Sequence, residues 1–298
     1  MSQVVLLLGC QGQLGTELQA KLAPWGEVIA VGRETFDLAR PESIRQLMQT
    51  VKPQIAINAA AYTAVDRAES EPELARAVNA IAPGILAEET KRSGATLIHI
   101  STDYVFDGSQ SHPYLETDAT RPLGVYGQSK RAGEVAVQTA CDRYIILRTA
   151  WVYGVHGKGN FVKTMLRLGA EREEIRVVAD QVGSPTWTQD IADAIAQLVA
   201  KGMPDEPHSI LKSGIYHYTS SGVASWYDFA VAIFEEVRSL GMPLKVKRIF
   251  PITTADYPTP ARRPAYSVLS CAKISAVLGG PPPHWRQGLR QMLRDFNH

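Results

Sequence analysis

The chain has 298 residues, of which 45% are hydrophobic and 20% are charged. This composition is typical of a globular protein with one large or two ordinary domains. Thirty-one basic residues stand against thirty acidic ones, so we expect no nucleic acid and no anionic membrane as the main partner. No apolar stretch reaches the roughly 20 residues that a membrane-spanning helix needs, and the expected location is cytoplasmic.

Strands and helices alternate through the first half of the chain. Residues 4–8 form a continuous apolar run, as expected of a strand buried on both faces of a parallel sheet. Further strands are predicted at residues 28–31, 55–57, 95–100 and 144–147, and helices at residues 13–22, 41–51, 72–93 and 126–139. This order predicts an α/β fold: a Rossmann-type doubly wound parallel sheet with its ligand at the carboxyl ends of the strands.

The rhythm changes after residue 153 and predicts a smaller substrate-binding domain. Helices are expected at residues 161–169, 190–200 and 225–240, with Ser225 and Asp228 as a capping box, and a last helix after a break at residues 279–283. A loop is expected at residues 204–214. We predict a dinucleotide-binding domain of residues 1–153 that also includes about 187–218, and a substrate-binding domain of residues 154–186 and 219–298.

A glycine-rich turn lies directly between the first strand and the first helix. Its spacing, Gly9-x-x-Gly12-x-x-Gly15, permits a tight turn, close approach of a pyrophosphate to the backbone, and an open helix N-terminus facing the phosphates. The predicted cofactor-binding residues of this turn are Gly9, Gln11, Gly12, Gln13, Leu14 and Gly15.

The end of the second strand bears on the choice of cofactor. Many NAD sites have an acidic residue there, whereas this chain has Arg33, whose guanidinium suits a 2′-phosphate. The alternative is a solvated arginine. Asp37 and Leu38 are predicted to lie near the adenine. NADPH is therefore the predicted cofactor, with NADH as a tolerated second one.

Small residues follow the third strand beside the predicted cleft. They allow the backbone to approach a cofactor closely, although simple packing of helix on sheet is an equal alternative. This predicted segment consists of Ala59, Ala60, Ala61, Tyr62 and Thr63.

Three residues form the predicted catalytic set. Tyr126 and Lys130 lie one helical turn apart, so the ammonium can lower the proton affinity of the phenol and hold the nicotinamide ribose. A tyrosine so placed can give a proton to a substrate oxygen. Thr102, at the end of the fourth strand, can hydrogen-bond the oxygen that becomes charged. A turn built by its own hydroxyl is the alternative for Thr102.

These features resemble the extended short-chain dehydrogenase/reductase superfamily, which has a GxxGxxG turn, a threonine on the fourth strand and a YxxxK helix. Longer motifs resemble the dTDP-4-dehydrorhamnose reductases and run from residue 4 to about residue 275. They include NAAAYTAVD at residues 58–66, STDYVF at residues 101–106, RTAWVY at residues 148–153, DQVGSPT at residues 180–186 and YPTPARRP at residues 257–264.

The resemblance implies reduction of the C4 keto group of dTDP-4-dehydro-β-L-rhamnose to dTDP-β-L-rhamnose, the last step of the nucleotide-sugar pathway. It gives Thr102, Tyr126 and Lys130 the catalytic roles. Residues expected to line the sugar are Asp103, Tyr104 and Trp151, and those expected near the nucleotide or its phosphates are Asn160, Gln181 and Arg263. A homodimer is compatible with the resemblance.

The sequence predicts no metal site. Seven histidines are scattered, and the cysteines Cys10, Cys141 and Cys271 are far apart and interpreted as reduced thiols. Some relatives of the resembled family use a carboxylate-built divalent ion at a subunit contact. Glu17 could supply one ligand, but Gln189 stands where a carboxylate would serve better.

Two alternatives stay open. The first is a nucleotide-sugar epimerase or dehydratase of the same superfamily. Dehydratases need an Asp-Glu pair beside the catalytic threonine, whereas Asp103 is followed here by Tyr104. The second is a non-catalytic regulatory subunit similar to the β-subunit of methionine adenosyltransferase, against which the intact set of Thr102, Tyr126 and Lys130 argues.

Overall fold

The computed structural model describes residues 3–202 and 211–296. Its centre is a sheet of six parallel strands in the order β10-β5-β4-β3-β1-β2. The strand order reverses between β1 and β3, which is the switch point where α/β sheets bind ligands. The strands are β1 Val4–Leu8, β2 Glu27–Val31, β3 Ile55–Asn58, β4 Thr96–Thr102, β5 Tyr144–Thr149 and β10 Gly214–His217.

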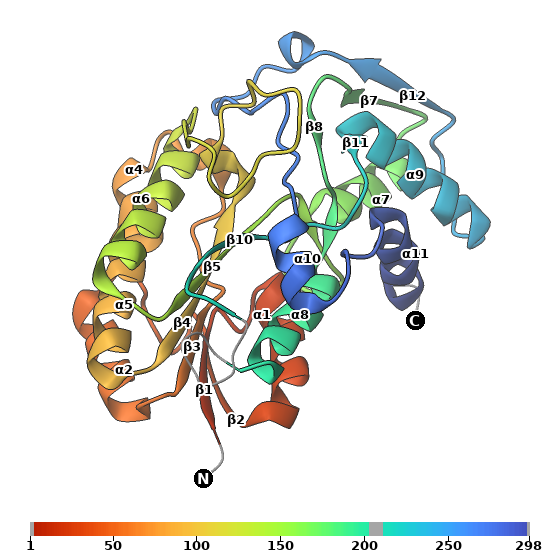
Figure 1. Cartoon of the computed structure of the whole chain (residues 1–298). Helices are drawn as coiled ribbons and strands as arrows, with labels where there is room; N and C mark the ends of the chain where they lie inside the picture. Colours follow the sequence, from red (N-terminus) through yellow and green to blue (C-terminus); the bar gives the residue numbers. More distant parts are fainter. Residues whose placement is uncertain (1–2, 203–210, 297–298) are drawn as a thin grey trace.

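Helices cover both faces of the sheet (Figure 1). Alternate residues of β1 point to opposite faces: Val5 and Leu7 join a hydrophobic cluster with α1, α8 and α10, and Leu6 and Leu8 join another with α2, α5 and α6. The continuous apolar run of this strand is explained by burial on both sides. The helices are α1 Gln13–Leu22, α2 Pro41–Val51, α5 Ala82–Ser93, α6 Val125–Ala140, α8 Thr188–Ala200 and α10 Ala272–Leu278.

The structure refines two predicted helices. The helix expected at residues 72–93 is continuous but contains a π-helical turn at Ala77–Ile81, between α4 Pro72–Arg76 and α5. Pro83, which has no N–H group to donate within a helix, lies just after this turn. The helix expected to end at Gly169 continues to Glu171, because Gly169 is buried against Phe234 and serves close packing.

A second group of elements gathers at the upper right of Figure 1 around its own hydrophobic cluster, which includes Val162, Phe229 and Leu289. The predicted capping box at Ser225 and Asp228 is confirmed. The strands β7 and β12 were not predicted. The elements are α7 Phe161–Glu171, α9 Trp226–Ser239, α11 Trp285–Phe296, and the strand pairs β6 Val152–Tyr153 with β9 Thr186–Trp187, β7 Glu174–Val178 with β12 Arg248–Ile252, and β8 Val182–Gly183 with β11 Ala224–Ser225.

Short elements complete the described chain. They are α3 Val65–Ala68 and the 3₁₀ turns Ala23–Trp25, Asp103–Val105 and Thr254–Asp256. The doubly wound parallel sheet is confirmed, while the predicted domain boundaries stay a prediction. Residues 204–210 of the expected loop lie outside the described residues.

Two further observations concern the whole described part. None of its helices is long and apolar enough to cross a membrane. The three cysteines are free thiols, as expected.

Candidate active site

The glycine-rich turn follows β1 and lies against the segment after β3. Gly9 has φ 86, and a Cβ there would lie 2.8 Å from the backbone nitrogen of Ala60. A Cβ at Gly15 would overlap the carbonyl oxygen of Gly9. The turn therefore requires glycine at both positions, and it places the predicted residues Ala59 and Ala60 beside it.

The N-terminus of α1 has no side-chain cap. Gly12 is the N-cap residue and Gln13 begins the helix, so the N–H groups of the first turn remain open to an anion. Leu14 is buried and anchors this turn in the core. Gln11 lies over the end of β2, because a Cβ at Gly32 would be 2.6 Å from its amide oxygen.

The remaining predicted cofactor residues lie in different surroundings. Arg33 is exposed just beyond β2. The Asp37 carboxylate accepts from Ala39 N at 2.9 Å, and Leu38 packs in the core beside α2. In the third segment, Ala61 is half-buried and Thr63 is exposed. The backbone of the buried Tyr62 is held by the side chain of Asn79 at 2.9 and 3.0 Å.

Thr102, Asp103 and Tyr126 come together at the carboxyl end of β4. The Thr102 hydroxyl donates to Asp103 Oδ1 at 3.0 Å and accepts from Tyr104 N at 3.2 Å. The Tyr126 phenol lies near this hydroxyl, which lowers its pKa. The rings of Tyr104 and Tyr126 meet edge to face, with centroids 5.5 Å apart. These four residues line one small region of the sheet edge.

Burial dominates the electrostatics of Tyr126. It raises the pKa of Tyr126 to about 12, and the Asp103 carboxylate adds to this, while the Thr102 hydroxyl opposes it. Lys130 is not among the groups that shift this pKa in the structure, so its expected lowering effect on the phenol stays a prediction. Tyr126 therefore carries its proton at neutral pH.

Lys130 is buried one helical turn further along α6. Its Nζ donates to the carbonyl oxygen of Ile100 at 2.6 Å. Burial lowers the pKa of Lys130 to about 8, and the negative charge of Glu134 opposes this shift. The bond to Ile100 thus fixes the position of the ammonium at the end of β4, while burial and Glu134 have opposite effects on its pKa.

Asp103 and Tyr104 are the predicted sugar-lining residues of this loop. Burial raises the pKa of Asp103 to about 6, although hydrogen bonds with Ser267 and Thr102 oppose this. Burial also raises the pKa of Tyr104, and the positive charge of Arg263 opposes this shift. Asp103 is thus a carboxyl group whose charge can change near neutral pH.

Arg263 is held by several groups of the protein. Its guanidinium forms two hydrogen bonds with the Asp66 carboxylate, at 3.0 and 2.8 Å, and donates to Thr259 Oγ1 at 2.6 Å. This pairing lowers the pKa of Asp66. Arg263 thus joins the segment after β3 to a distant part of the chain.

Trp151 has an unusual backbone conformation for an aromatic residue, with φ 48. Its ring stacks on Trp226 with centroids 3.5 Å apart and an interplanar angle of 2°. Backbone strain of this kind gathers at functional sites.

Two other residues predicted to contact the nucleotide are hydrogen-bonded to side chains of this chain. Asn160 caps α7 and donates to Gln13 Oε1 at 2.7 Å, which joins it to the glycine-rich turn. Gln181 is buried and donates to Thr254 Oγ1 at 3.1 Å.

Several residues of this region were not predicted from the sequence. Glu134 and Arg148 form a buried pair behind Lys130, Ser267 opposes the rise in the pKa of Asp103, and Trp226 stacks on Trp151. Two features of the sequence could have indicated the buried pair. Glu134 follows Lys130 at helical spacing, and Arg148 is a charged residue inside an apolar strand.

The described residues contain no group of three or more His, Cys, Asp or Glu side chains suited to a metal ion. Glu17 lies 3.7 Å from His156, and burial raises the pKa of Glu17. The absence of a metal site stays a prediction.

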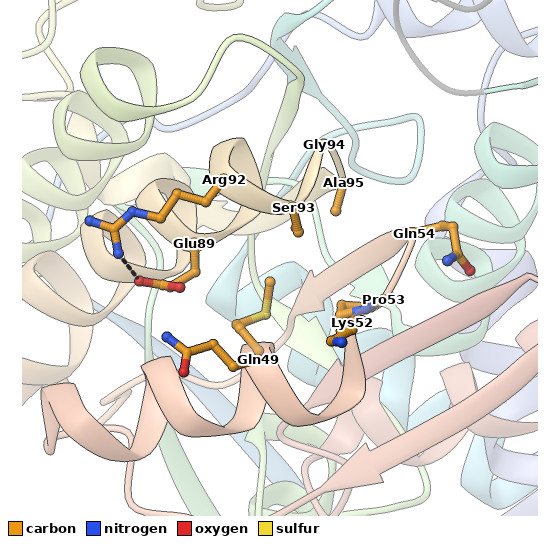
Figure 2. A pocket seen from close by; sticks show the side chains of 10 residues that line it. Gln49, Lys52, Pro53, Gln54, Glu89, Arg92, Ser93, Gly94 and Ala95 are labelled. Atoms are coloured by element: carbon orange, nitrogen blue, oxygen red, sulfur yellow. Dashed lines mark hydrogen bonds and ion pairs between the residues drawn. The ribbon is translucent and has the colours of Figure 1, made fainter.

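A pocket of about 410 Å³ lies at the opposite edge of the sheet (Figure 2). It is bounded by residues 52–54 before β3 and by residues 93–95 before β4, at the amino ends of these strands. The Glu89–Arg92 pair lines it. Because the strands are parallel, this pocket is remote from Thr102 and the glycine-rich turn.

A doubly wound parallel sheet with a glycine-rich turn after β1, a threonine ending β4 and a YxxxK helix defines an extended short-chain dehydrogenase/reductase. The sequence model described as "RmlD substrate binding domain" matches residues 3–298. The chain belongs to the dTDP-4-dehydrorhamnose reductase family.

The relatives match along almost the whole chain. The dTDP-4-dehydrorhamnose reductase of Burkholderia thailandensis is 47% identical over 98% of this chain and 98% of its own length. That of Escherichia coli is 45% identical over 98% and 97%. A crystal structure of the Bacillus anthracis enzyme, in complex with NADP, has a TM-score of 0.89 and 38% identity, covering 99% of this chain and all of that one.

Proposed function

We propose that this protein is an oxidoreductase that reduces the C4 keto group of dTDP-4-dehydro-β-L-rhamnose to dTDP-L-rhamnose with NADPH. The full-length similarity to reductases of that name supports the substrate. The observation that carries the chemistry is that Tyr126 and Lys130, one turn apart on α6, both lie at the end of β4, with Tyr126 near Thr102 and Lys130 bound to the Ile100 carbonyl.

The residues fit the cofactor. The open N-terminus of α1 and the glycine-rich turn suit a pyrophosphate, and the NADP-bound structure of the Bacillus anthracis relative supports this choice. When bound, the cofactor supplies the hydride. Arg33 is proposed to meet the 2′-phosphate, which makes NADPH the preferred cofactor with NADH tolerated.

The chain supplies the proton and the charge stabilisation. Tyr126 holds its proton at neutral pH and gives it to the C4 oxygen of the sugar as that oxygen becomes an alkoxide. The Thr102 hydroxyl, which donates to Asp103 in the structure, turns to donate a hydrogen bond to the same oxygen. The ammonium of Lys130 stabilises the phenolate that remains on Tyr126.

The other site assignments extend this proposal. Asp103, Tyr104 and Trp151 are proposed to line the sugar. For Asn160, Gln181 and Arg263 we propose contacts with the nucleotide, made together with the protein contacts that already hold these side chains. A cytoplasmic location and a homodimer are likewise part of the proposal.

One assay tests the function. The pure protein is incubated with enzymatically generated dTDP-4-dehydrorhamnose and with NADPH or NADH, and oxidation of the cofactor is followed at 340 nm. We expect sugar-dependent oxidation, faster with NADPH. Well-folded protein that binds NADPH without oxidising it would instead favour the regulatory-subunit alternative. Turnover of dTDP-4-keto-6-deoxyglucose without an added 3,5-epimerase would point to a broader activity than this reduction alone.

A further inference from the structure

A buried ion pair lies behind the catalytic face of α6. The side chains of Glu134 and Arg148 are 0% and 1% exposed. Arg148 Nε and Nη2 donate to the two carboxylate oxygens of Glu134, each at 2.8 Å, and Ser101 Oγ donates to Glu134 Oε1 at 2.6 Å. Apolar residues often fill such a space with equal or better stability. Packing alone therefore gives no reason for this pair.

The far side of Arg148 is anchored as well. Its Nη1 lies 3.3 Å from His217 Nε2, and His217 Nδ1 lies 3.1 Å from the carbonyl oxygen of Tyr114. Burial lowers the pKa of His217 to about 3. A neutral ring that donates from Nδ1 and accepts at Nε2 satisfies both contacts. The Phe106 ring also lies 5.1 Å from the guanidinium, so β4, β5 and β10 together fix the position of Glu134.

Glu134 and Lys130 reach neighbouring residues of β4, since Glu134 binds Ser101 and Lys130 binds the Ile100 carbonyl. Tyr126, Lys130 and Glu134 are spaced by four residues along α6 and therefore share one side of the helix. The Glu134 carboxylate is the group that raises the pKa of Lys130 against the effect of burial.

The other groups around Lys130 offer no such charge. His99 on β4 is buried, its pKa is well below the ordinary value because of burial and of Lys130, and its Nδ1 lies 3.1 Å from Asn58 Nδ2. On the side of the π-helical turn, Asn79 and Ser129 are neutral and bond to each other at 3.1 Å. Arg131, on α6 itself, is a further cation and lies 3.4 Å from Glu134. Asp103 acts on Tyr126.

We propose that Glu134 is a positioning residue for the reduction: its carboxylate, fixed by Arg148 and Ser101, keeps Lys130 in the ammonium form one turn from Tyr126. The inference rests on the proposed function and adds a residue to its machinery. Because Glu134 reaches the chemistry through Lys130, its effect depends on the charge of that lysine.

The test is the pH dependence of turnover in Glu134→Gln, which keeps the shape of the side chain and removes its charge. Activity that needs the Lys130 ammonium is lost as the pH rises through the pKa of Lys130. Without Glu134 this pKa falls, so the alkaline limb of kcat should move to lower pH by on the order of one unit. Turnover should fall several-fold more at pH 8.5 than at pH 6.5. A uniform loss at all pH values, with the limb unmoved, would overturn the proposal.

Glu89→Gln is the matched control. Glu89 is also a buried helical carboxylate, 4% exposed and paired with Arg92 at 2.5 Å, but it lies at the opposite edge of the sheet (Figure 2). Its variant should leave the alkaline limb unchanged. If Glu134→Gln alone does not fold because Arg148 is left unpaired, the double variant Glu134→Gln with Arg148→Gln removes both charges. The alkaline limb of kcat is then measured in the double variant, and an unmoved limb would overturn the proposal.

A second measurement separates this proposal from the proposed function. The affinity for NADPH, measured by its fluorescence without any sugar, should also weaken at alkaline pH when the Lys130 ammonium is lost. In Glu134→Gln this break should move to lower pH by a similar amount. Absence of sugar-dependent turnover in the wild type would count against the function, whereas breaks that coincide in wild type and variant would reject the role of Glu134.

Discussion

The indole rings of Trp151 and Trp226 lie parallel, with centroids 3.5 Å apart. Trp151 follows β5 at the carboxyl edge of the sheet, and Trp226 is the first residue of α9, whose other side chains pack in the second hydrophobic cluster. The stack therefore means that α9, in the second group of elements, sets the orientation of the Trp151 ring, which is predicted to line the sugar.

Removal of the supporting ring should weaken sugar binding. An aromatic pair of this kind contributes about 0.5–1.5 kcal/mol, so Trp226→Ala should raise the KM for the dTDP-sugar up to about tenfold, with a smaller effect on kcat. Trp226→Phe should retain most of the affinity. The exposed Trp25 gives a control, since Trp25→Ala should leave KM unchanged. Equal KM values for Trp226→Ala and wild type would mean that Trp151 needs no support.

Local spacing predicted the parts of the site that lie within one element. Tyr126 and Lys130 share a helix, and Thr102 ends a strand whose order follows from the βαβ alternation, so their meeting could be predicted. The pairs Trp151–Trp226, Arg148–Glu134 and Asp66–Arg263 join elements far apart in the sequence. No periodicity indicates such pairs.

The raised pKa of Tyr126 could not be predicted from the sequence for a related reason. Proximity to Lys130 is visible in the sequence, whereas the burial that dominates the pKa of the phenol is a property of the folded chain. The continuation of α7 through Gly169 was missed for the same reason, because the side chains that pack on this glycine come from distant segments.

Loss of the Tyr126 hydroxyl should remove the proton donor. We expect Tyr126→Phe to lower kcat by about 10²–10⁴-fold, the usual range for general acid catalysis, while NADPH binding changes little. Steady-state kinetics and NADPH fluorescence measure the two effects. Tyr144→Phe, on β5 at the amino end of the sheet, removes the same atom away from the site and should be active. An unchanged kcat in Tyr126→Phe would reject the assigned role.

A methyl group at Gly15 should disrupt the cofactor turn. Its Cβ would overlap the carbonyl oxygen of Gly9, which is backbone and cannot move aside cheaply. We expect Gly15→Ala to weaken NADPH binding by at least tenfold and to lower the melting temperature, since overpacking costs about 1–3 kcal/mol. At Gly159 an added Cβ meets nothing within 4 Å. Gly159→Ala should therefore match the wild type in both measurements.

Arg33 should decide between the two cofactors. A charge-assisted hydrogen bond is worth about 1.5–3 kcal/mol, so Arg33→Ala should lower kcat/KM for NADPH by roughly 10–100-fold and leave that for NADH nearly unchanged. Arg40 is also exposed, and Arg40→Ala controls for the loss of one positive charge from this surface. An equal decrease in kcat/KM with both cofactors would mean that Arg33 does not bind the 2′-phosphate.

The burial of Lys130 should also make the free energy of unfolding depend on pH. Its pKa is about 8 in the folded chain, against an ordinary value of 10.5. The unfolded chain therefore binds more protons between these pH values, and the burial of Lys130 becomes less costly as the pH rises. At about 1.4 kcal/mol per pKa unit, the full difference is about 3 kcal/mol.

Lys130→Met removes this dependence. The free energy of unfolding of the variant, relative to wild type, should therefore be most favourable below pH 8 and should decrease by up to about 3 kcal/mol as the pH approaches 10.5. Loss of the hydrogen bond to Ile100 lowers the stability of the variant equally at all pH values. Urea unfolding at a series of pH values measures the difference, with the exposed Lys158→Met as the control for one lost ammonium. A difference that does not change with pH would show that the folded chain leaves the proton affinity of Lys130 unaltered.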